Sequence, residues 1–336
     1  MKLAVLSPVA WRTPPRHYGP WEQVASNICE GMVGEGIDVT LFATKDSITQ
    51  AKLEAVVEKG YAEDSTVNAK VVECLHISHL MEMSDSFDLI HNNFDYLPLT
   101  YSRLIKTPML TTIHGFSSPS IIPVFKKYDA TNHYVSISNS DRSSELNYLA
   151  TVYNGVKEES FEFNPEGGDY LLFFSRIHPE KGTYESIQIA KKSKKRLIIS
   201  GIIQDENYFN EKVKPYINGD DIIYIGSSGP EKRNKLLGNA LALLHPISFE
   251  EPFGLSVVES MFCGTPVIAF DLGSMPELIE DTKTGFIVNN IDEASEALKQ
   301  IKNLDRKYIS RYSRNKFSVA KMIKEYLKVY NFILGK

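Results

Sequence analysis

Short, nearly continuous runs of apolar residues recur along the chain, separated by polar loops and longer amphipathic segments. The runs cover residues 2–7, 38–43, 87–92, 109–113, 134–138, 170–174, 196–199, 222–225, 240–244 and 267–270. Apolar runs of this length are typical of strands buried on both faces of a parallel sheet, with helices as the crossovers. The pattern therefore predicts an α/β chain built from doubly wound sheets.

The amphipathic segments predict individual helices. Glu22 to Glu35 has helical periodicity through Val24, Ile28 and Met32. The tail from residue 317 to 330 has Met322, Tyr326, Val329 and Tyr330 on one connected face, which also predicts a helix.

Two stretches between the runs have less regular patterns. Residues 47–66 are polar and predicted to be helical, and Val71 to Leu75 is predicted to be a strand. His76 and His79 follow at a three-residue spacing, but nothing nearby completes a metal site, so no metal is expected there.

Residues 248–266 combine a strand end, a tight loop and a short helix. Pro252 and Gly254 break the chain, residues 255–262 are predicted to be helical, and Gly264 ends that helix. A glycine turn that opens a helix leaves backbone N–H groups free, and with the helix dipole they form a site for a phosphate.

Two glutamates flank this predicted phosphate site. From Gly254 to Glu259 the helix rises by about 7–8 Å, at roughly 1.5 Å per residue, which matches the reach from a phosphate to a ribose. Glu259 is thus expected to accept hydrogen bonds from ribose hydroxyls. Glu251, which precedes the helix, is expected to point at the group that the phosphate carries.

Composition and charge narrow the class of protein. The 336 residues suffice for two domains of about 150 residues. The net charge is −5 and no basic face is evident, which argues against nucleic acid and against docking on anionic lipid. No run of about 18 apolar residues predicts a transmembrane helix. Three cysteines in no metal-like spacing suggest free thiols in a reducing cytoplasm.

The run from Glu250 to Pro266 resembles the glutamate–seven–glutamate signature of retaining glycosyltransferases of family 4. The likeness continues through residues 273–279 and 284–286. The resemblance implies the GT-B fold, in which two Rossmann-like domains face a cleft. We expect an acceptor-side domain at 1–155 and a nucleotide-sugar-binding domain at 156–316. Residues 317–336 are then a helix that packs back on the first domain.

The resemblance also supplies donor-binding residues after the expected linker at Asn154-Gly155. Arg176 and Lys181 flank a proline turn at a strand end, and two cations at this spacing can reach one diphosphate. The amides near Gly254 and Leu255 would complete the contact with the leaving group. The other expected donor-binding positions are Gly226, near the nucleobase, Glu251, Phe253 and Glu259.

Before the linker, the resemblance points to fewer residues. His114 follows a strand and precedes a glycine, and in the family this histidine contacts the donor sugar. Gly19 stands where family members have two glycines, but Pro20 replaces the second and has no N–H for a phosphate. Arg12, Arg16 and His17 either face the acceptor or are simply solvated.

The implied activity is retaining transfer of a hexose from a nucleotide diphosphate sugar to a small-molecule or glycan acceptor. UDP-hexose is preferred as donor and GDP-mannose remains open. The family uses no divalent metal here, and the chain has no Asp-x-Asp; no further cofactor is expected. The leaving phosphate itself would take the acceptor proton.

Other functions remain open. One alternative is a nucleotide-sugar epimerase or hydrolase on the same fold, which would turn over the donor without an acceptor. Another is a non-catalytic binding subunit, which the retained Arg176, Lys181, Glu251 and Glu259 oppose. A nicotinamide dehydrogenase is disfavoured because no Gly-x-Gly-x-x-Gly follows a strand.

Overall fold

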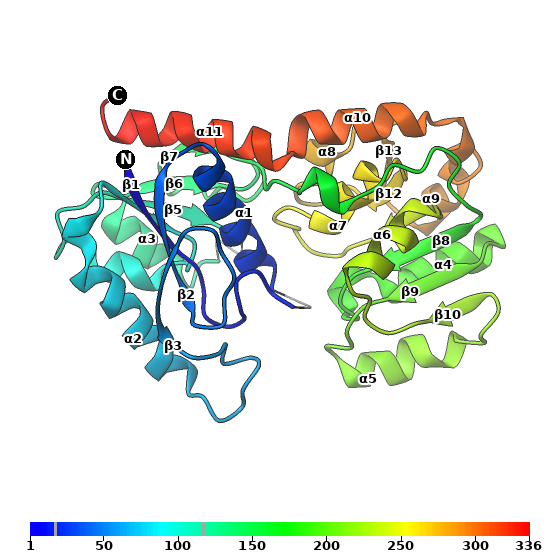
Figure 1. Cartoon of the computed structure of the whole chain (residues 1–336). Helices are drawn as coiled ribbons and strands as arrows, with labels where there is room; N and C mark the ends of the chain where they lie inside the picture. The colour runs from blue at the N-terminus through cyan, green and yellow to red at the C-terminus, as the bar shows by residue number, and fades with distance from the viewer. Residues whose placement is uncertain (17–18, 116–117) are drawn as a thin grey trace. The chain divides into compact units, whose positions relative to one another are not determined.

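The computed structural model describes residues 1–16, 19–115 and 118–336, and it divides the chain into two compact units. Unit 1 comprises Met1–Gly155 together with Val319–Lys336, and unit 2 comprises Val156–Ser318. Each unit holds one parallel sheet with helices around it (Figure 1). The expected α/β class with two doubly wound, Rossmann-like domains is confirmed.

Unit 1 contains a seven-stranded sheet in the order β3-β2-β1-β4-β5-β6-β7. Its strands are β1 Lys2–Leu6, β2 Asp38–Thr44, β3 Lys52–Val57, β4 Leu89–Asn92, β5 Met109–Ile113, β6 His133–Ser136 and β7 Tyr148–Thr151. Its helices are α1 Pro20–Gly34, α2 Ala69–Glu82, α3 Ile122–Tyr128 and α11 Val319–Ile333.

Alternate residues of β1 belong to two different cores, one on each face of this sheet. Leu3 and Val5 join the cluster formed with α1 and α11, whereas Ala4 and Leu6 join the cluster formed with α2 and α3. Because a strand in the middle of a doubly wound sheet is covered on both faces, it has to be apolar at every position. This burial explains the continuous apolar run at the N-terminus.

The apolar face of α11 is buried in unit 1, where the helix packs against α1 (Figure 1). Buried polar contacts also tie it to the sheet. Tyr330 Oη lies 2.6 Å from His91 Nδ1, and Tyr326 Oη lies 2.8 Å from Thr112 Oγ1. A buried polar group without a hydrogen-bond partner lowers folding stability, so these contacts fix the position of α11 against β4 and β5.

Unit 2 contains a six-stranded sheet in the order β10-β9-β8-β11-β12-β13. Its strands are β8 Tyr170–Phe174, β9 Leu197–Ser200, β10 Ile222–Tyr224, β11 Ala240–His245, β12 Val267–Phe270 and β13 Gly285–Val288. Its helices are α4 Thr183–Ser193, α5 Glu206–Tyr208, α6 Pro230–Gly238, α7 Leu255–Phe262, α8 Met275–Leu278, α9 Ile291–Ala297 and α10 Arg306–Phe317.

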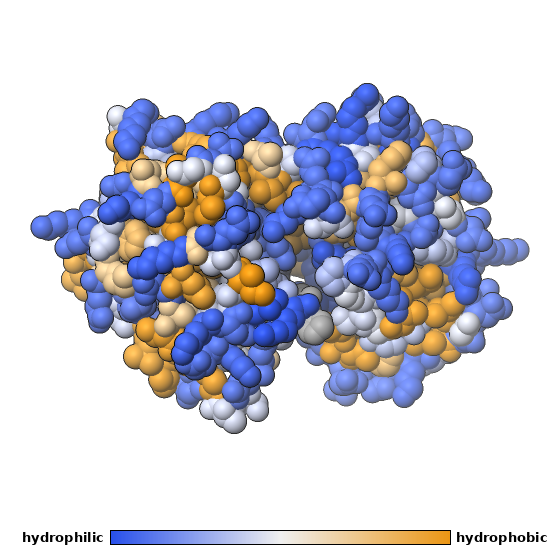
Figure 2. All heavy atoms as spheres, in the orientation of Figure 1, coloured by the Kyte–Doolittle hydropathy of each residue, from blue (hydrophilic) through white to orange (hydrophobic). Residues whose placement is uncertain are grey.

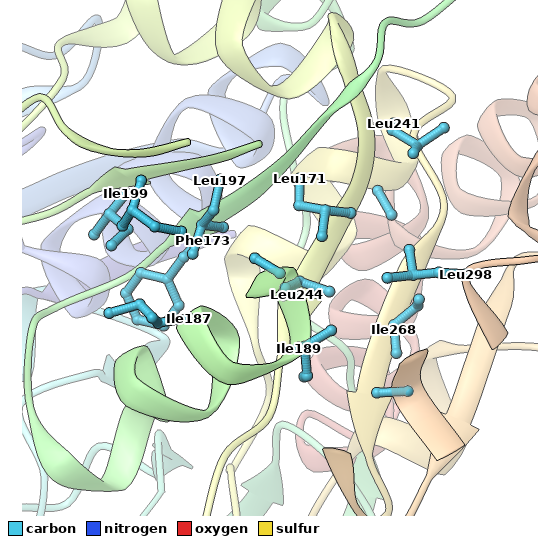
Figure 3. Packing of buried hydrophobic residues seen from close by; sticks show 14 of the residues in the cluster. Leu171, Phe173, Ile187, Ile189, Leu197, Ile199, Leu241, Leu244, Ile268 and Leu298 are labelled. Carbon is cyan, nitrogen blue, oxygen red and sulfur yellow. The ribbon is translucent and has the colours of Figure 1, made fainter. Parts of the chain in front are cut away.

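Residues from the central strands of unit 2 pack with those of α4 and α9 in one core. Figure 3 shows Leu171, Phe173 and Leu197 from the sheet beside Ile187 and Ile189 of α4. These side chains are almost completely buried. Because this core is closely packed, the strands are rigid, and the loops at their carboxyl ends start from fixed positions.

Two element predictions are wrong. Within residues 47–66 the chain forms β3, a parallel partner of β2, rather than a helix. As a partly exposed edge strand, β3 carries charged residues that obscure the strand pattern. Residues 71–75 lie in helix α2 rather than in a strand. Its buried residues His76, Ile77, Leu80 and Met81 recur at helical spacing, whereas Val71 and Leu75 are exposed.

The surface is mixed in character. Figure 2 shows hydrophilic residues over most of the face in view, with hydrophobic residues in separate patches. Among the described residues, no helix is both long and apolar enough to cross a membrane.

Candidate active site

Helix α7 begins in a turn that only glycine fits well. Gly254, its N-cap residue, has φ 96°, and a Cβ there would lie 2.8 Å from Met275 Cε. No side chain caps the helix, and the first helical residue is Leu255. The first amides of α7 therefore keep the capacity to bind an anion, as the sequence predicted for this position.

The loop before α7 is held by the segment that follows β12. Ser274 donates its backbone N–H to Glu251 O at 2.9 Å and its hydroxyl to Phe253 O at 2.5 Å. At Gly273, φ is 58° and a Cβ would lie 2.3 Å from Glu251 N, so only glycine allows this approach. The Phe253 ring is buried, 6.1 Å from that of Phe317, so Phe253 has only its backbone to offer a ligand.

Glu251 lies between two basic side chains. Its Oε2 is 2.5 Å from Lys181 Nζ and 3.5 Å from His245 Nε2, and the latter atom is buried without a closer partner. Burial acts to raise the pKa of Glu251. The nearby His245 and the charge of Lys181 outweigh it and lower that pKa to about 2. Glu251 is therefore an ionised carboxylate at neutral pH.

Lys181 is itself buried, with 7% of the residue exposed. Burial lowers its pKa, the charge of Glu251 opposes that effect, and the nearby charge of Arg176 lowers the pKa further. The ammonium also lies 4.4 Å from the centre of the Phe249 ring. Lys181 is thus a cation fixed by packing rather than a mobile surface lysine.

The loops after the neighbouring strands β8 and β11 are in direct contact. Gly182 has φ 74°, and a Cβ there would lie 1.9 Å from Pro246 O. Ser248 donates its N–H to Glu180 O at 2.9 Å. This contact leaves no room for a side chain at Gly182. The glycine therefore allows the two loops to lie close together, and that places Lys181 beside Glu251.

Arg176 and Glu259 are placed differently. Arg176 is partly exposed and donates to the side chain of Gln204. Glu259 is 8% exposed and lies 3.2 Å from Arg233 Nη1. Burial raises the pKa of Glu259, and the charge of Arg233 only partly opposes this. Glu259 therefore retains a buried carboxyl that can accept further hydrogen bonds.

Gly226 follows β10. Its carbonyl oxygen accepts the N–H of Gly201 at 3.1 Å and the hydroxyl of Ser200 at 2.9 Å. Its φ is 72°, and no atom lies within 4 Å of the place where a Cβ would stand. The backbone of Gly226 is therefore open to a ligand.

In unit 1, His114 follows β5 and its imidazole is held from two sides. Its Nε2 lies 3.0 Å from Asn93 Oδ1, and its ring stacks on Trp21 at 5.8 Å between centroids. Burial lowers the pKa of His114 to about 3, so the ring is neutral. Because Asn93 Oδ1 can only accept, the proton is assigned to Nε2, and the buried, unpartnered Nδ1 is an acceptor.

The remaining predicted residues of unit 1 lie near the start of α1. Gly19 is the N-cap residue, with φ 149°, and a Cβ there would lie 2.9 Å from Pro15 Cβ. Arg16 pairs with Asp46 and Glu63 at 2.9 and 2.8 Å.

Arg12, also expected at the acceptor side, donates from Nε to Pro14 O at 2.9 Å. His17 lies outside the described residues. Both arginines of this loop are therefore engaged within unit 1.

The structure brings some predicted residues together and adds others. Lys181 and Glu251 are in contact and the charge of Arg176 acts on Lys181, whereas Glu259 pairs with Arg233. Three further polar neighbours went unpredicted: His245, Arg233 and Asn93. His245 ends β11 just as His114 follows β5, so its strand-end position was a usable signal. Among the described residues, no group of three or more His, Cys, Asp or Glu is placed to hold a metal ion.

Solved structures share this two-sheet architecture, which agrees with the expected GT-B fold. Sucrose-phosphate synthase of Thermosynechococcus elongatus superposes with a TM-score of 0.81 at 16% identity, covering 100% of this chain and 99% of the other. Anabaena HepE in complex with UDP and glucose gives 0.76 at 17% identity, covering 99% and 100%.

The sequence also carries a family signature. Residues 156–316, nearly the whole of unit 2, match the family described as glycosyl transferases group 1. Trehalose synthase of Pyrococcus horikoshii is 27% identical over 196 residues, which are 53% of this chain. The alignment spans 47% of that enzyme's length, so about half of it has no counterpart in the match.

Proposed function

We propose that the protein transfers a hexose, with retention and without a metal, from a nucleotide diphosphate sugar to an acceptor. The observation that carries the proposal is the cluster of Lys181, Glu251 and His245 beside the uncapped start of α7. It lies at the carboxyl ends of the adjacent strands β8 and β11, the edge at which open α/β sheets bind ligands.

The chemistry of transfer suits these side chains. As the bond to the anomeric carbon breaks, negative charge grows on the departing diphosphate. Arg176, Lys181 and the amides at Gly254 and Leu255 would stabilise this charge. Such preorganised groups are most effective where water is excluded, and Lys181 is buried. The leaving phosphate, once charged, would itself accept the proton of the acceptor hydroxyl.

The other residues have binding roles in this proposal. Glu259 accepts hydrogen bonds from the ribose hydroxyls, and the open backbone at Gly226 approaches the nucleobase. Glu251 is held ionised and orients the hexose. In unit 1, His114 Nδ1 accepts a hydrogen bond from a hydroxyl of the transferred hexose. The UDP bound to the related fold of HepE favours a UDP-hexose donor.

A matched pair of alanine variants tests the proposal. Arg176→Ala removes the cation whose charge acts on Lys181, and Lys232→Ala removes an exposed lysine of α6. We expect the Arg176 variant to turn over the donor about 10²–10³-fold more slowly with an unchanged melting temperature, because one charge-stabilising donor is lost. The Lys232 variant should match the wild type. Equal rates for all three proteins would refute the proposed stabilisation of the leaving diphosphate by Arg176.

A further inference from the structure

An arginine of α6 pairs with the glutamate that is proposed to bind the ribose. Arg233 Nη1 lies 3.2 Å from Glu259 Oε1, and only 8% of Glu259 is exposed. A carboxylate that is buried to this extent needs a cation nearby to remain charged. Among the described residues, Arg233 is the cation that forms an ion pair with it.

The guanidinium of Arg233 is held by an aromatic ring as well as by the carboxylate. Its Cζ lies 5.2 Å from the centre of the Phe161 ring. Phe161 is buried, and its ring meets that of Phe262 edge-on at 6.4 Å. Phe262 belongs to α7 and follows Glu259 by three residues, which places both on one face of that helix. Helix α7 therefore positions both groups that hold Arg233.

The residue after Arg233 attaches α6 to the same two places. Asn234 Oδ1 accepts the backbone N–H of Glu162 at 3.0 Å. It also accepts the thiol hydrogen of Cys263, the residue that ends α7, at 3.4 Å. Because two successive residues of α6 contact residues 161–162 or the end of α7, the fold itself sets the position of Arg233 beside Glu259.

The pair is not arranged as an ion pair that serves stability alone. Arginine binds a carboxylate most strongly through two parallel hydrogen bonds. Here Arg233 acts on Glu259 through its charge, and Arg233 Nε is buried without a hydrogen-bond partner. A buried donor without a partner lowers stability and calls for an explanation. A carboxylate that is held by charge keeps its hydrogen-bonding capacity for a ligand.

We infer that Arg233 is a positioning residue for the donor, which keeps the buried Glu259 carboxylate charged and in place for the ribose hydroxyls. The inference rests on the proposed function, in which Glu259 binds the ribose. It deepens that proposal by naming the residue that sets the preference for ribose over deoxyribose. A hydrogen bond to a charged acceptor is roughly twice as strong as one between neutral groups. Loss of the charge should therefore weaken recognition of the hydroxyls more than that of the rest of the nucleotide.

The test compares a ribonucleotide with its 2′-deoxy form. The ribonucleotide is whichever of UDP, GDP and ADP raises the melting temperature of the full chain most. Calorimetry gives the Kd of both forms. Their ratio isolates recognition of the 2′-hydroxyl, since both forms carry the same base and the same diphosphate. We expect the wild type to prefer the ribonucleotide by about tenfold or more.

Arg233→Gln removes the charge and keeps a polar side chain. We expect the preference for the ribonucleotide to fall by about fivefold or more at pH 7. The preference should recover towards pH 8.5, because the buried carboxyl without its cation ionises at a higher pH. Arg233→Lys retains a positive charge, so its preference should stay within about threefold of that of the wild type.

Arg311→Gln is the matched control. Arg311 is an exposed arginine of α10, and its guanidinium also lies over an aromatic ring, 5.6 Å from the centre of that of Tyr308. This variant should bind both nucleotides as the wild type does.

Two results overturn the inference. One is an Arg233→Gln variant that loses affinity equally for both nucleotides, because an unchanged ratio would make Arg233 a purely structural residue. The other needs no substitution: a wild-type ratio that rises by about threefold or more from pH 7 to pH 8.5 would show that Arg233 does not keep Glu259 charged. A wild type that binds no nucleotide, or binds both forms equally, would instead contradict the proposed donor site, and this inference with it.

Discussion

At the scale of single residues, the pair formed by Lys181 and Glu251 shows how a charge survives burial. Both side chains are mostly buried, with 9% and 12% exposed. Glu251 depends on Lys181 and His245 for stability in the ionised form, and Lys181 depends on Glu251. Taking ions out of water is costly, and only close opposite charges offset the cost. The pair therefore keeps a cation at the proposed diphosphate site at the expense of folding stability.

This dependence can be measured with a double-mutant cycle. We expect Lys181→Met and Glu251→Gln each to lower the free energy of unfolding by about 3–5 kcal/mol, because each leaves a buried group without its partner. The double variant should be more stable than the sum of the two losses predicts. Urea denaturation gives all four values, and strictly additive losses would show that the two side chains act independently.

The pH dependence of stability follows from the lowered pKa of Glu251. An acid whose pKa is lower in the folded than in the unfolded chain stabilises the fold above its unfolded pKa, about 4.5. That contribution disappears as the pH falls through the folded value of about 2. The stability difference between the wild type and Glu251→Gln should thus be smaller at pH 3 than at pH 6. A difference that grows on acidification would contradict the cause assigned to this shift.

At the scale of elements, tight glycine turns position the cluster. Gly182 and Gly36 have nearly the same φ, 74° and 75°, but only at Gly182 would a Cβ collide with backbone. We expect Gly36→Ala to cost about 1 kcal/mol of stability and to leave donor turnover unchanged. Gly182→Ala should cost more and slow donor turnover at least about tenfold, because the loop that carries Lys181 must shift away from Pro246.

Thermal unfolding and donor turnover of the two glycine variants decide this point. If Gly182→Ala behaves like Gly36→Ala in both measurements, the contact between the β8 and β11 loops does not position Lys181.

The predictability of an element depended on how much of it is buried. Residues 255–262 were expected to form a helix, and α7 has those bounds, because Gly254 and Gly264 mark both ends. Two elements were assigned wrongly. The edge strand β3 has charged residues on its exposed side, and the helix α2 has apolar ones there, so the hydrophobic periodicity of neither element is clear in the sequence. The contact of His245 with Glu251 depends on two loops meeting in space, which sequence spacing does not encode.

At the scale of the whole molecule, the residues proposed to bind the donor nucleotide all belong to unit 2. Arg176, Lys181, Glu251 and Glu259 lie within Val156–Ser318, whereas His114 lies within unit 1. Pattern and resemblance predicted the fold class because alternating apolar runs and amphipathic segments have few packing solutions. They did not identify the acceptor.

The most direct test of the central claim is hydrogen–deuterium exchange of the full chain with and without nucleotide. The ligand is whichever of UDP, GDP and ADP raises the melting temperature most, since binding to the native state stabilises it. We predict slower exchange at the backbone amides of residues 175–182, 226–229 and 251–259, with no matching change around His114. Protection confined to unit 1, or none at a saturating nucleotide concentration, would contradict the account.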